Sequence, residues 1–199
     1  MKKRRSNEAS DADLSRRALR GDHSAWRALV RRHTPMVYRL SARILGPGPE
    51  AEDACQEAFL KMHRALHQYD PTRPLAPWLG RITYHVCLKR LARVKGDAEA
   101  TDPVELGQML DERAASPERA AADREAGRIM QAALDTLSAQ DRALITLRYV
   151  EGMTDVEVGE AVGMHRNTVR TRLFRARQAL RKMLGPLFDK PLFDKAGDR

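Results

Sequence analysis

The sequence predicts an all-α protein in which two small helical domains are joined by a flexible acidic linker. Apolar residues recur at intervals of three and four, and no stretch shows the alternation that is typical of a strand. Aromatic residues make up only 5% of the chain, and Ala, Leu, Arg and Glu dominate it. Residues 1–95, 96–126 and 127–199 have net charges of +11, −6 and +4. Two basic blocks around an acidic one favour two domains that face a polyanion.

The first block begins with a basic stretch, and two helices are expected after it. Residues 1–9 are expected to be a disordered basic arm, because no hydrophobic segment follows KKRR as it would in a secretory signal. A short helix is predicted over residues 11–20, and a longer one over 23–46. Pro35 is expected to bend or restart the longer helix, because proline lacks the amide donor. The residues GPGP at 46–49 end it.

The helix expected over residues 50–67 has two different sides. One side is a regular apolar stripe that includes Ala54, Cys55 and Ala58. The opposite side falls within an arc of about 100° and consists of Asp53, Gln56, Glu57, Leu60 and Arg64. A merely solvated face has no need of a leucine, so this side is a candidate docking surface for another protein. The alternative is a stray surface leucine, which is common.

A stiff loop follows, with the sequence YDPTRPLAPW at residues 69–78. Pro77 is expected in the first turn of a basic helix over about 78–93, where proline is favoured. A rigid loop flanked by Tyr69 and Trp78 could hold an unstacked base. An ordinary core role for the Trp78 ring is the alternative. The predicted DNA contacts of this region are Arg73, Trp78, Arg81, His85 and Lys89.

Residues 127–185 are expected to form a second domain of four helices. A helical pattern resumes at residue 127, and Ser138 is a plausible N-cap for a helix that ends at Gly152. Thr154 and Glu157 have the spacing of a capping box, which predicts the start of a short helix. Gly163 stands where that helix needs a left-handed C-terminal residue.

A second helix after Gly163 completes a helix-turn-helix pattern. Val169, Leu173, Ala176 and Leu180 form its apolar stripe, and no acidic residue lies between Arg166 and Phe188. A solvated basic face is the alternative reading, but the coincidence of cap, turn and one-signed charge favours DNA binding. The predicted DNA contacts are Arg166, Asn167, Thr168, Arg170, Thr171, Arg172, Arg175 and Arg177. Residues 186–199 form a tail in which PLFDK occurs twice.

Two segments resemble bacterial sigma factors of the extracytoplasmic-function (ECF) group, within the sigma-70 family. The first covers residues 22–91, and EDACQEAFLKMHRAL at 52–66 and RPLAPWLGRI at 73–82 carry the resemblance. The second covers residues 134–184, where LRYVEGMTDVEVGEAVGM and NTVRTRLFRARQALR carry it. Both segments stand in the order that the family has, with a variable linker between them.

The resemblance implies a dissociable promoter-specificity subunit of RNA polymerase. Residues 10–95 would be sigma region 2, 96–126 the linker and 127–185 sigma region 4. Asp53, Gln56, Glu57 and Leu60 match the surface that docks on core polymerase. The loop 69–77 and the next helix match the part that melts the minus-ten element and captures a flipped base, and residues 166–177 match the reader of the minus-thirty-five element. The implied partners are core RNA polymerase, promoter DNA and an anti-sigma factor.

Two other classes of protein are alternatives to a sigma factor. His63 and His67 lie four residues apart, and with Cys55 they could suggest a metal site, but Cys55 falls on the apolar stripe. No phosphate-binding glycine loop or nucleophile elbow is present, so no enzyme, metal or cofactor is expected. The second alternative is a stand-alone helix-turn-helix regulator with an N-terminal ligand or dimerisation domain.

The cysteines and the hydropathy pattern bear on location. Cys55 and Cys87 are the only cysteines, and both fall on apolar helical stripes. Unpaired core thiols are typical of a reducing cytoplasm. No apolar run approaches the length of a membrane span, so we expect a cytoplasmic protein without direct membrane insertion.

Overall fold

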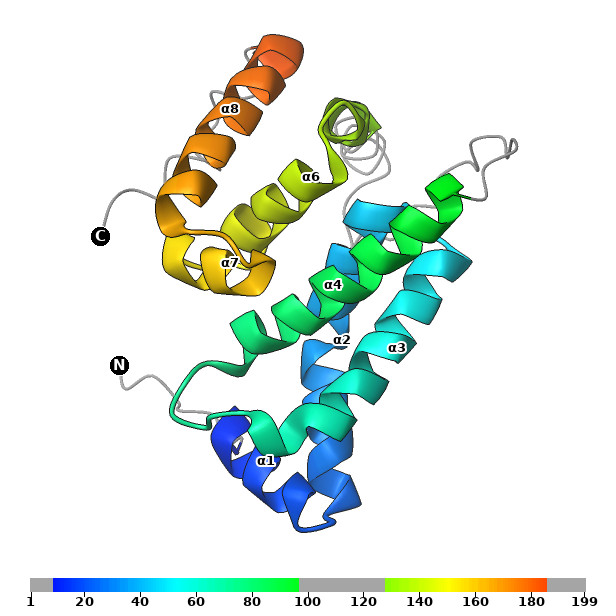
Figure 1. The fold of residues 1–199 in the computed structure, drawn as a ribbon, viewed down its shortest axis with the longest axis vertical. Coiled ribbons are helices and arrows are strands. Elements are labelled where there is room, and N and C mark those ends of the chain that lie inside the picture. The colour runs from blue at the N-terminus through cyan, green and yellow to red at the C-terminus, as the bar shows by residue number, and fades with distance from the viewer. Residues whose placement is uncertain (1–8, 97–127, 186–199) are drawn as a thin grey trace, which may run out of the picture.

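The computed structural model describes residues 9–96 and 128–185, and every regular element within these ranges is helical. The all-α prediction is therefore confirmed for the described part of the chain. The expected basic arm, most of the acidic linker and the PLFDK repeat lie outside it. In chain order (Figure 1), the elements are α1 (Asp11–Leu19), α2 (His23–Leu45), α3 (Pro49–Ala65), η1 (Leu66–Gln68), α4 (Leu75–Gly96), a helix over residues 128–135, α6 (Ala139–Ile145), η2 (Thr146–Val150), α7 (Asp155–Val162) and α8 (Arg166–Leu184).

The first helical set, α1 to α4, packs around an apolar core that includes Leu29, Val37, Met62 and Leu79. Helices α2, α3 and α4 lie beside one another, and α1 covers the end of the group at which η1 leads into the loop before α4 (Figure 1). The carboxylate of Asp22 caps α2 by accepting hydrogen bonds from the backbone amides of Ser24 and Ala25. These contacts fix the orientation of α3 and α4, which carry the predicted sites of this set.

Two helix boundaries in the first set differ from the sequence-based expectation. Helix α2 continues through Pro35, so the expectation that this proline restarts the helix is wrong. Pro35 lies on the exposed side, where water can hydrate the carbonyl that lacks an amide partner. Helix α4 begins at Leu75, three residues before Trp78. Pro77 still falls in the first turn, where no amide is needed for an intrahelical bond.

The second helical set consists of the helix over residues 128–135, α6, η2, α7 and α8. Its helix ends confirm the predicted capping residues. The Ser138 hydroxyl accepts from the Asp141 amide and caps α6. Thr154 and Glu157 form both bonds of the capping box that starts α7, and Gly163 ends α7 in the left-handed conformation (φ 71°, ψ 32°). Val156 of α7 is apolar and yet 50% exposed. It stands two residues from the buried Val158, which is about 160° away around a helix at 100° per residue.

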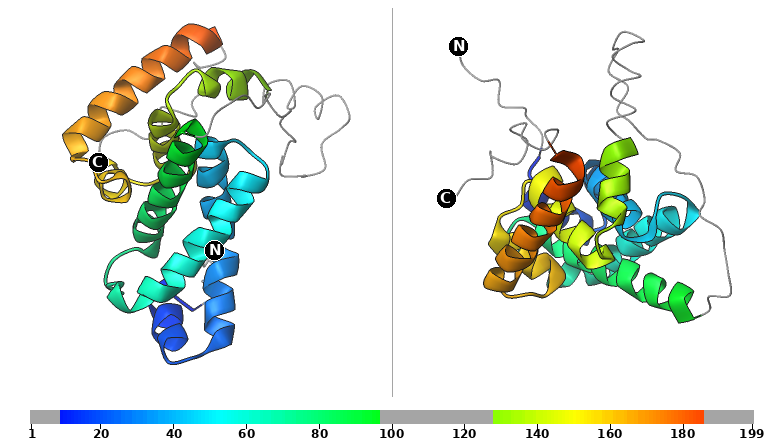
Figure 2. Two further views of the ribbon diagram at one scale, coloured as in Figure 1. Left: turned by 45° about the vertical axis from the view of Figure 1, so that its right-hand side comes forward. Right: turned by 90° about the horizontal axis from the view of Figure 1, so that it is seen from above.

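The two helical sets pack directly on one another. A single apolar cluster contains Leu40 and Ile44 of α2, Tyr84 and Val86 of α4, and the buried residues of α6, α7 and α8. The main contacts join α4 to α7 and α2 to α6, and both views in Figure 2 show the second set lying along α4. The bulk of the described chain is therefore one packed body with a seam between the sets.

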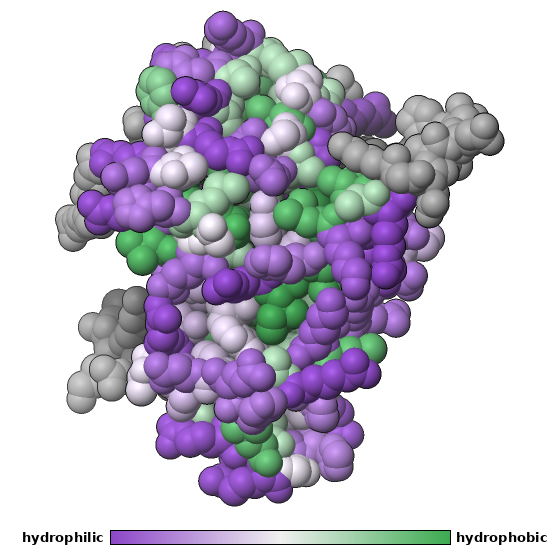
Figure 3. All heavy atoms as spheres, in the orientation of Figure 1, coloured by the Kyte–Doolittle hydropathy of each residue, from purple (hydrophilic) through white to green (hydrophobic). Residues whose placement is uncertain are grey.

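The surface seen in Figure 3 is mostly hydrophilic, with apolar patches between the charged side chains. Within the described residues, no helix has both the length and the apolar character needed to cross a membrane. Cys55 and Cys87 are buried free thiols, as the sequence predicts. Burial raises the pKa of both, that of Cys87 to about 11, so neither is a reactive thiolate at neutral pH.

Candidate nucleic-acid and protein interfaces

The five residues predicted to dock on a protein lie together along α3. Leu60 is 60% exposed, and Asp53, Gln56 and Arg64 are exposed beside it, while Glu57 is half-buried. The buried residues of α3 occupy the other side, as the spacing in the sequence requires. We call Asp53, Gln56, Glu57, Leu60 and Arg64 the α3 face. Its apolar centre within a charged rim is the composition that protein interfaces have.

Arg90 of α4 reaches across to the α3 face and holds its carboxylates in place. Its guanidinium lies 3.1 Å from the Glu57 carboxylate, 3.2 Å from Glu50 and 3.6 Å from Asp53. A hydrogen bond from Lys61, supported by those from Arg90, holds the pKa of Glu57 below its usual value. Only the crossing of α3 and α4 brings Arg90 to these carboxylates.

The loop before α4 is held rigid by its own contacts. Tyr69 is buried, its hydroxyl donates to the Arg73 carbonyl at 2.6 Å, and its ring packs against Trp78 with centroids 5.4 Å apart. The Asp70 carboxylate accepts from the Thr72 amide, which closes the turn. Trp78 is half-buried, so one part of the ring belongs to the core and another part stays accessible.

The other predicted DNA contacts of the first set form a row. Arg81, His85 and Lys89 are exposed at intervals of four residues along α4, which places them on one side of the helix. The His85 ring is held by a hydrogen bond between Nδ1 and the Arg81 carbonyl, at 2.8 Å. Arg73 does not join this row, because its guanidinium is paired with Glu160 of α7.

Helix α8 presents the predicted DNA contacts of the second set. Val169, Leu173, Ala176 and Leu180 are buried, as predicted, and fix the orientation of the helix. His165 caps it by accepting from the Asn167 amide. The first three residues of α8, Arg166 to Thr168, follow the Gly163 turn closely and are all exposed. The exposed members of the predicted set are Arg166, Asn167, Thr168, Arg170, Thr171, Arg175 and Arg177.

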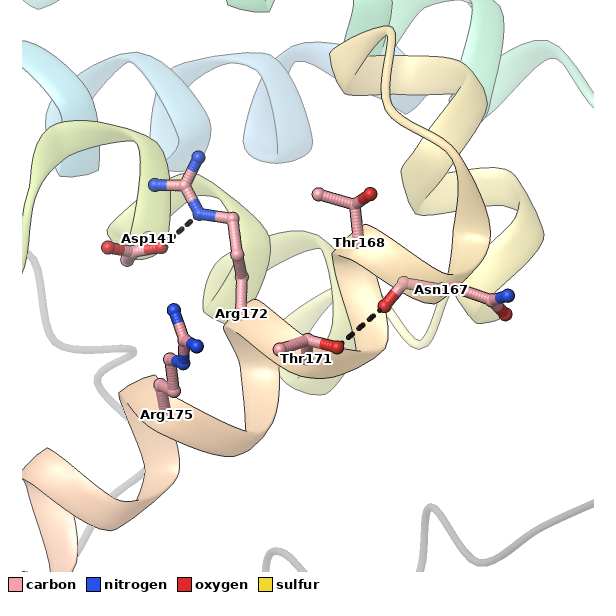
Figure 4. A pocket seen from close by; sticks show the side chains of 6 residues that line it. All are labelled: Asp141, Asn167, Thr168, Thr171, Arg172 and Arg175. Atoms are coloured by element: carbon pink, nitrogen blue, oxygen red, sulfur yellow. Dashed lines mark hydrogen bonds and ion pairs between the residues drawn. The ribbon is translucent and has the colours of Figure 1, made fainter.

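Arg172 differs from the other arginines of α8. Figure 4 shows its side chain directed toward α6, where Nε donates to Asp141 at 2.8 Å and one terminal nitrogen donates to Gln140 at 2.7 Å. Arg172 therefore ties α8 to α6, and it lies at the edge of an open pocket. The pocket is lined by Asp141, Asn167, Thr168, Thr171, Arg172 and Arg175.

Phe174 is a candidate contact that is missing from the predicted set. Its ring is 57% exposed on the outward side of α8, between Thr171 and Gln178 in a row of three- and four-residue spacing. Helical spacing could have predicted this exposure, because Phe174 lies about 100° around the helix from the buried Leu173 and so cannot share its apolar stripe. An exposed phenyl ring on a recognition helix can contact a thymine methyl group.

The alternative metal site finds no support in the geometry. Within residues 9–96 and 128–185, no three His, Cys, Asp or Glu side chains gather in a way that could hold a metal ion. The His63 ring packs edge-on against Trp26, with centroids 4.8 Å apart, and Cys55 is buried in the core.

Both helical sets match models of known protein families. The sigma-70 region 2 family model matches residues 29–96, and the sigma-70 region 4 model matches residues 127–180. The chain is 30% identical to the ECF sigma factor SigW of Bacillus subtilis, over 84% of this chain and 93% of SigW. It is 33% identical to SigM of Mycobacterium tuberculosis, over 91% of this chain and 88% of SigM. The chain belongs to the ECF group of RNA polymerase sigma factors.

Further relatives agree with this assignment. SigE of Mycolicibacterium smegmatis is 36% identical over 82% of this chain, which matches 64% of that longer protein. Among solved structures, CnrH in complex with the cytosolic domain of CnrY superposes with a TM-score of 0.64 at 26% identity, over 87% of this chain and 96% of CnrH. RpoE of Bartonella quintana, solved with the anti-sigma factor NepR, has the same fold with a TM-score of 0.62 at 19% identity, over 80% of this chain and 94% of RpoE. As a sigma factor, the chain directs core polymerase to promoters and initiates transcription there.

Proposed function

We propose that three surfaces of this sigma factor divide the work of promoter recognition. The α3 face docks on core RNA polymerase. The loop over residues 69–77, with Trp78 and the row Arg81, His85 and Lys89, opens the minus-ten element and takes up an unpaired base. The exposed side of α8 reads the minus-thirty-five element. Each assignment rests on the chemistry of the exposed residues and on the family resemblance.

The observation that carries the proposal is the difference in chemistry between two exposed helix faces. The α3 face has an apolar side chain, 60% exposed, among carboxylates that are held by Arg90. Carboxylates repel nucleic acid, so a protein is the partner that this face suits. The α8 face has arginines around uncharged residues that can contact base edges, which suits duplex DNA.

The three DNA roles on α8 differ by position. Arg166 and Arg170 lie near the N-terminus of the helix, where side chains reach base edges or the nearest phosphates. Arg175 and Arg177 lie further along and contact the backbone, which adds affinity without sequence preference. Arg172 contributes by holding α8 on α6, and its charge adds to the attraction for phosphate.

An anti-sigma factor that covers these surfaces and a cytoplasmic location complete the proposal. Both rest on analogy with the family, in which a soluble subunit exchanges between polymerase and an inhibitor. The protein needs no catalytic group or cofactor in this role, because the polymerase supplies the chemistry.

A gel shift on promoter DNA, with and without core polymerase, tests the proposed function. We expect specific retention of a DNA fragment that carries both elements only when the polymerase is present. A stand-alone regulator would retain its own site as a single protein. Specific binding without polymerase, together with no effect of polymerase, would therefore overturn the proposal.

A further inference from the structure

The three exposed side chains in the row along α4 differ in the hydrogen bonds that they can make. Arg81 and Lys89 carry only donors, whereas a neutral imidazole carries one donor and one acceptor. His85 lies between the two cations, four residues from each, on the same side of the helix. His85 is therefore the one member of this row that can accept a hydrogen bond from DNA.

A contact of the His85 ring decides which of its nitrogens is the acceptor. Nδ1 lies 2.8 Å from the Arg81 carbonyl oxygen. A carbonyl oxygen can only accept, so the hydrogen of the neutral ring is on Nδ1 and the free lone pair is on Nε2. Because Nδ1 is turned back to its own helix and the side chain is exposed, Nε2 is the nitrogen that faces a ligand.

The ring of His85 is held in this orientation by a second contact. It packs edge-on against the ring of Tyr84, with centroids 5.7 Å apart and an angle of 89° between the planes. Tyr84 is buried and only 2% exposed, so it belongs to the fixed core of the protein. The acceptor on Nε2 is thus preorganised, and little conformational entropy is lost when it binds.

A single acceptor separates the four bases into two classes in the major groove. Adenine presents its N6 amino group there and cytosine its N4 amino group, and both can donate. Guanine and thymine present no donor in the major groove. An acceptor on Nε2 therefore favours adenine or cytosine on the strand that it contacts, and it disfavours guanine and thymine.

The position of His85 relative to Trp78 places this contact on paired DNA. The two residues are seven apart, so they lie within about 20° of each other around the helix and about 10 Å apart along it. This distance spans about three base pairs at 3.4 Å each. Apart from Trp78, the one Phe, Tyr or Trp of α4 is the buried Tyr84. Unpaired bases bind on accessible rings, so the part of α4 beyond Trp78 suits a duplex.

The two cations of the row have a different task. Arg81 and Lys89 lie about 6 Å along the helix on either side of His85. Long cationic side chains contact phosphates, which positions a protein on DNA without reading the sequence. The imidazole is short and has no such reach, so it reads the base edge that the two cations bring next to it.

We propose that His85 is a specificity-determining residue, whose Nε2 accepts a hydrogen bond from the amino group of an adenine or cytosine. This base lies in the duplex, about three base pairs from the base that Trp78 takes up. The proposal rests on the proposed function of α4 at the minus-ten element. It adds the class of base that this chain selects and the atom that selects it.

Transcription by the complete holoenzyme tests this proposal. The templates are a promoter library in which each base pair of the minus-ten region is varied. We expect wild type to prefer adenine or cytosine at one position by roughly 2–10-fold, as one hydrogen bond allows. His85→Ala should lose this preference. His85→Lys should reverse it toward guanine or thymine, because an ammonium group can only donate.

A matched variant and a modified base separate reading from general binding. Lys89→Ala should weaken transcription from every member of the library alike, because a phosphate contact carries no sequence preference. At the position that wild type selects, adenine is then replaced by purine, which lacks only the amino group. The replacement should weaken promoter binding by wild type holoenzyme and should have a smaller effect on His85→Ala, measured as the difference between the two proteins.

The possible outcomes distinguish this inference from the proposed function. An unchanged base preference in His85→Ala, or an equal effect of purine on both proteins, would overturn the role of His85. A wild type that selects bases in the minus-ten region but nowhere favours adenine or cytosine over guanine and thymine would overturn it as well. A wild type with no base preference anywhere in that region would instead refute the proposed function of α4.

Discussion

Helices α3 and α8 are built on the same plan and present opposite chemistry. Each buries one apolar stripe and exposes charged residues, and each is held by an ion of opposite sign from a neighbouring helix. Arg90 of α4 holds the carboxylates of α3, whereas Asp141 of α6 holds Arg172 of α8. The α3 face has a leucine at its centre, and the face of α8 has Phe174 among polar and basic residues. In the proposed function, the sign of the surrounding charges selects the class of partner, and the apolar side chain at the centre makes the specific contact.

The largest effect is expected at the centre of the α3 face. Leu60→Asp should abolish binding of core polymerase, because it places a charge at the centre of the proposed apolar contact. The fold should remain intact, since an exposed substitution changes the stability by about 0.5 kcal/mol or less. Pull-down with core polymerase measures the binding, and circular dichroism measures the fold.

Leu19→Asp is the matched control for that experiment. Leu19 is 52% exposed on α1, away from the α3 face, so its replacement should leave polymerase binding unchanged. Equal binding by Leu60→Asp and wild type would remove the proposed docking role from α3.

Substitutions on α8 should change which DNA is preferred. Arg170→Ala should weaken recognition of the upstream element by about 1–3 kcal/mol if Arg170 makes a bidentate base contact. Competition binding by the holoenzyme on matched and mismatched upstream elements measures the preference. An equal loss on all sequences, with a smaller salt dependence, would instead identify a phosphate contact.

Phe174→Ala sharpens the same comparison without a change of charge. We expect discrimination at one thymine-containing position to fall, while the salt dependence of binding stays constant. A uniform loss of affinity with unchanged preference would mean that the ring only fills space near the DNA backbone.

Arg90 and Arg172, which both form ion pairs between helices, should differ in their contribution to stability. Arg172→Ala removes the charged donor of the half-buried Asp141, which keeps only the Ser138 hydroxyl, and the donor to Gln140, so it should lower the free energy of unfolding by about 1–3 kcal/mol. Arg90→Gln leaves carboxylates that water can reach, so the loss should be about 1 kcal/mol or less. Urea denaturation of both variants measures the difference, and equal losses would contradict the distinction between the two faces.

The smallest effect concerns pH and the α3 face alone. The folded pKa of Glu57 lies below its ordinary value of 4.5, so its ion pairs stabilise the fold above that pH. This contribution is lost as the pH falls through the lower folded pKa. The difference in melting temperature between wild type and Arg90→Gln should therefore be present at neutral pH and vanish in strong acid. A difference that stays constant with pH would assign the effect of Arg90 to packing.

The local structure could be predicted from the sequence where a short-range rule decides it. The capping box of Thr154 and Glu157, the left-handed Gly163 and the Ser138 cap depend on residues within four positions of each other. The α8 stripe follows from helical spacing, and the exposure of Leu60 follows from the same rule. These features define the shape of α8 and of the α3 face.

What escaped prediction depends on contacts between distant parts of the chain. Arg90 and Glu57 are 33 residues apart, and Arg73 and Glu160 are 87 residues apart. The chain gives no local sign that Gly80 faces Ala161, because a glycine inside a helix pattern fits many contexts. The packing of the two helical sets on one another therefore became visible only in the fold.

Run-off transcription with purified core polymerase on a pooled genomic promoter library tests the central claim most directly. We predict that wild type yields transcripts whose promoters share one pair of elements, and that Leu60→Asp yields none. Arg170→Ala should shift the set of promoters that are used. Silence of the wild type with core polymerase, together with specific binding of the protein alone to duplex DNA, would contradict the account.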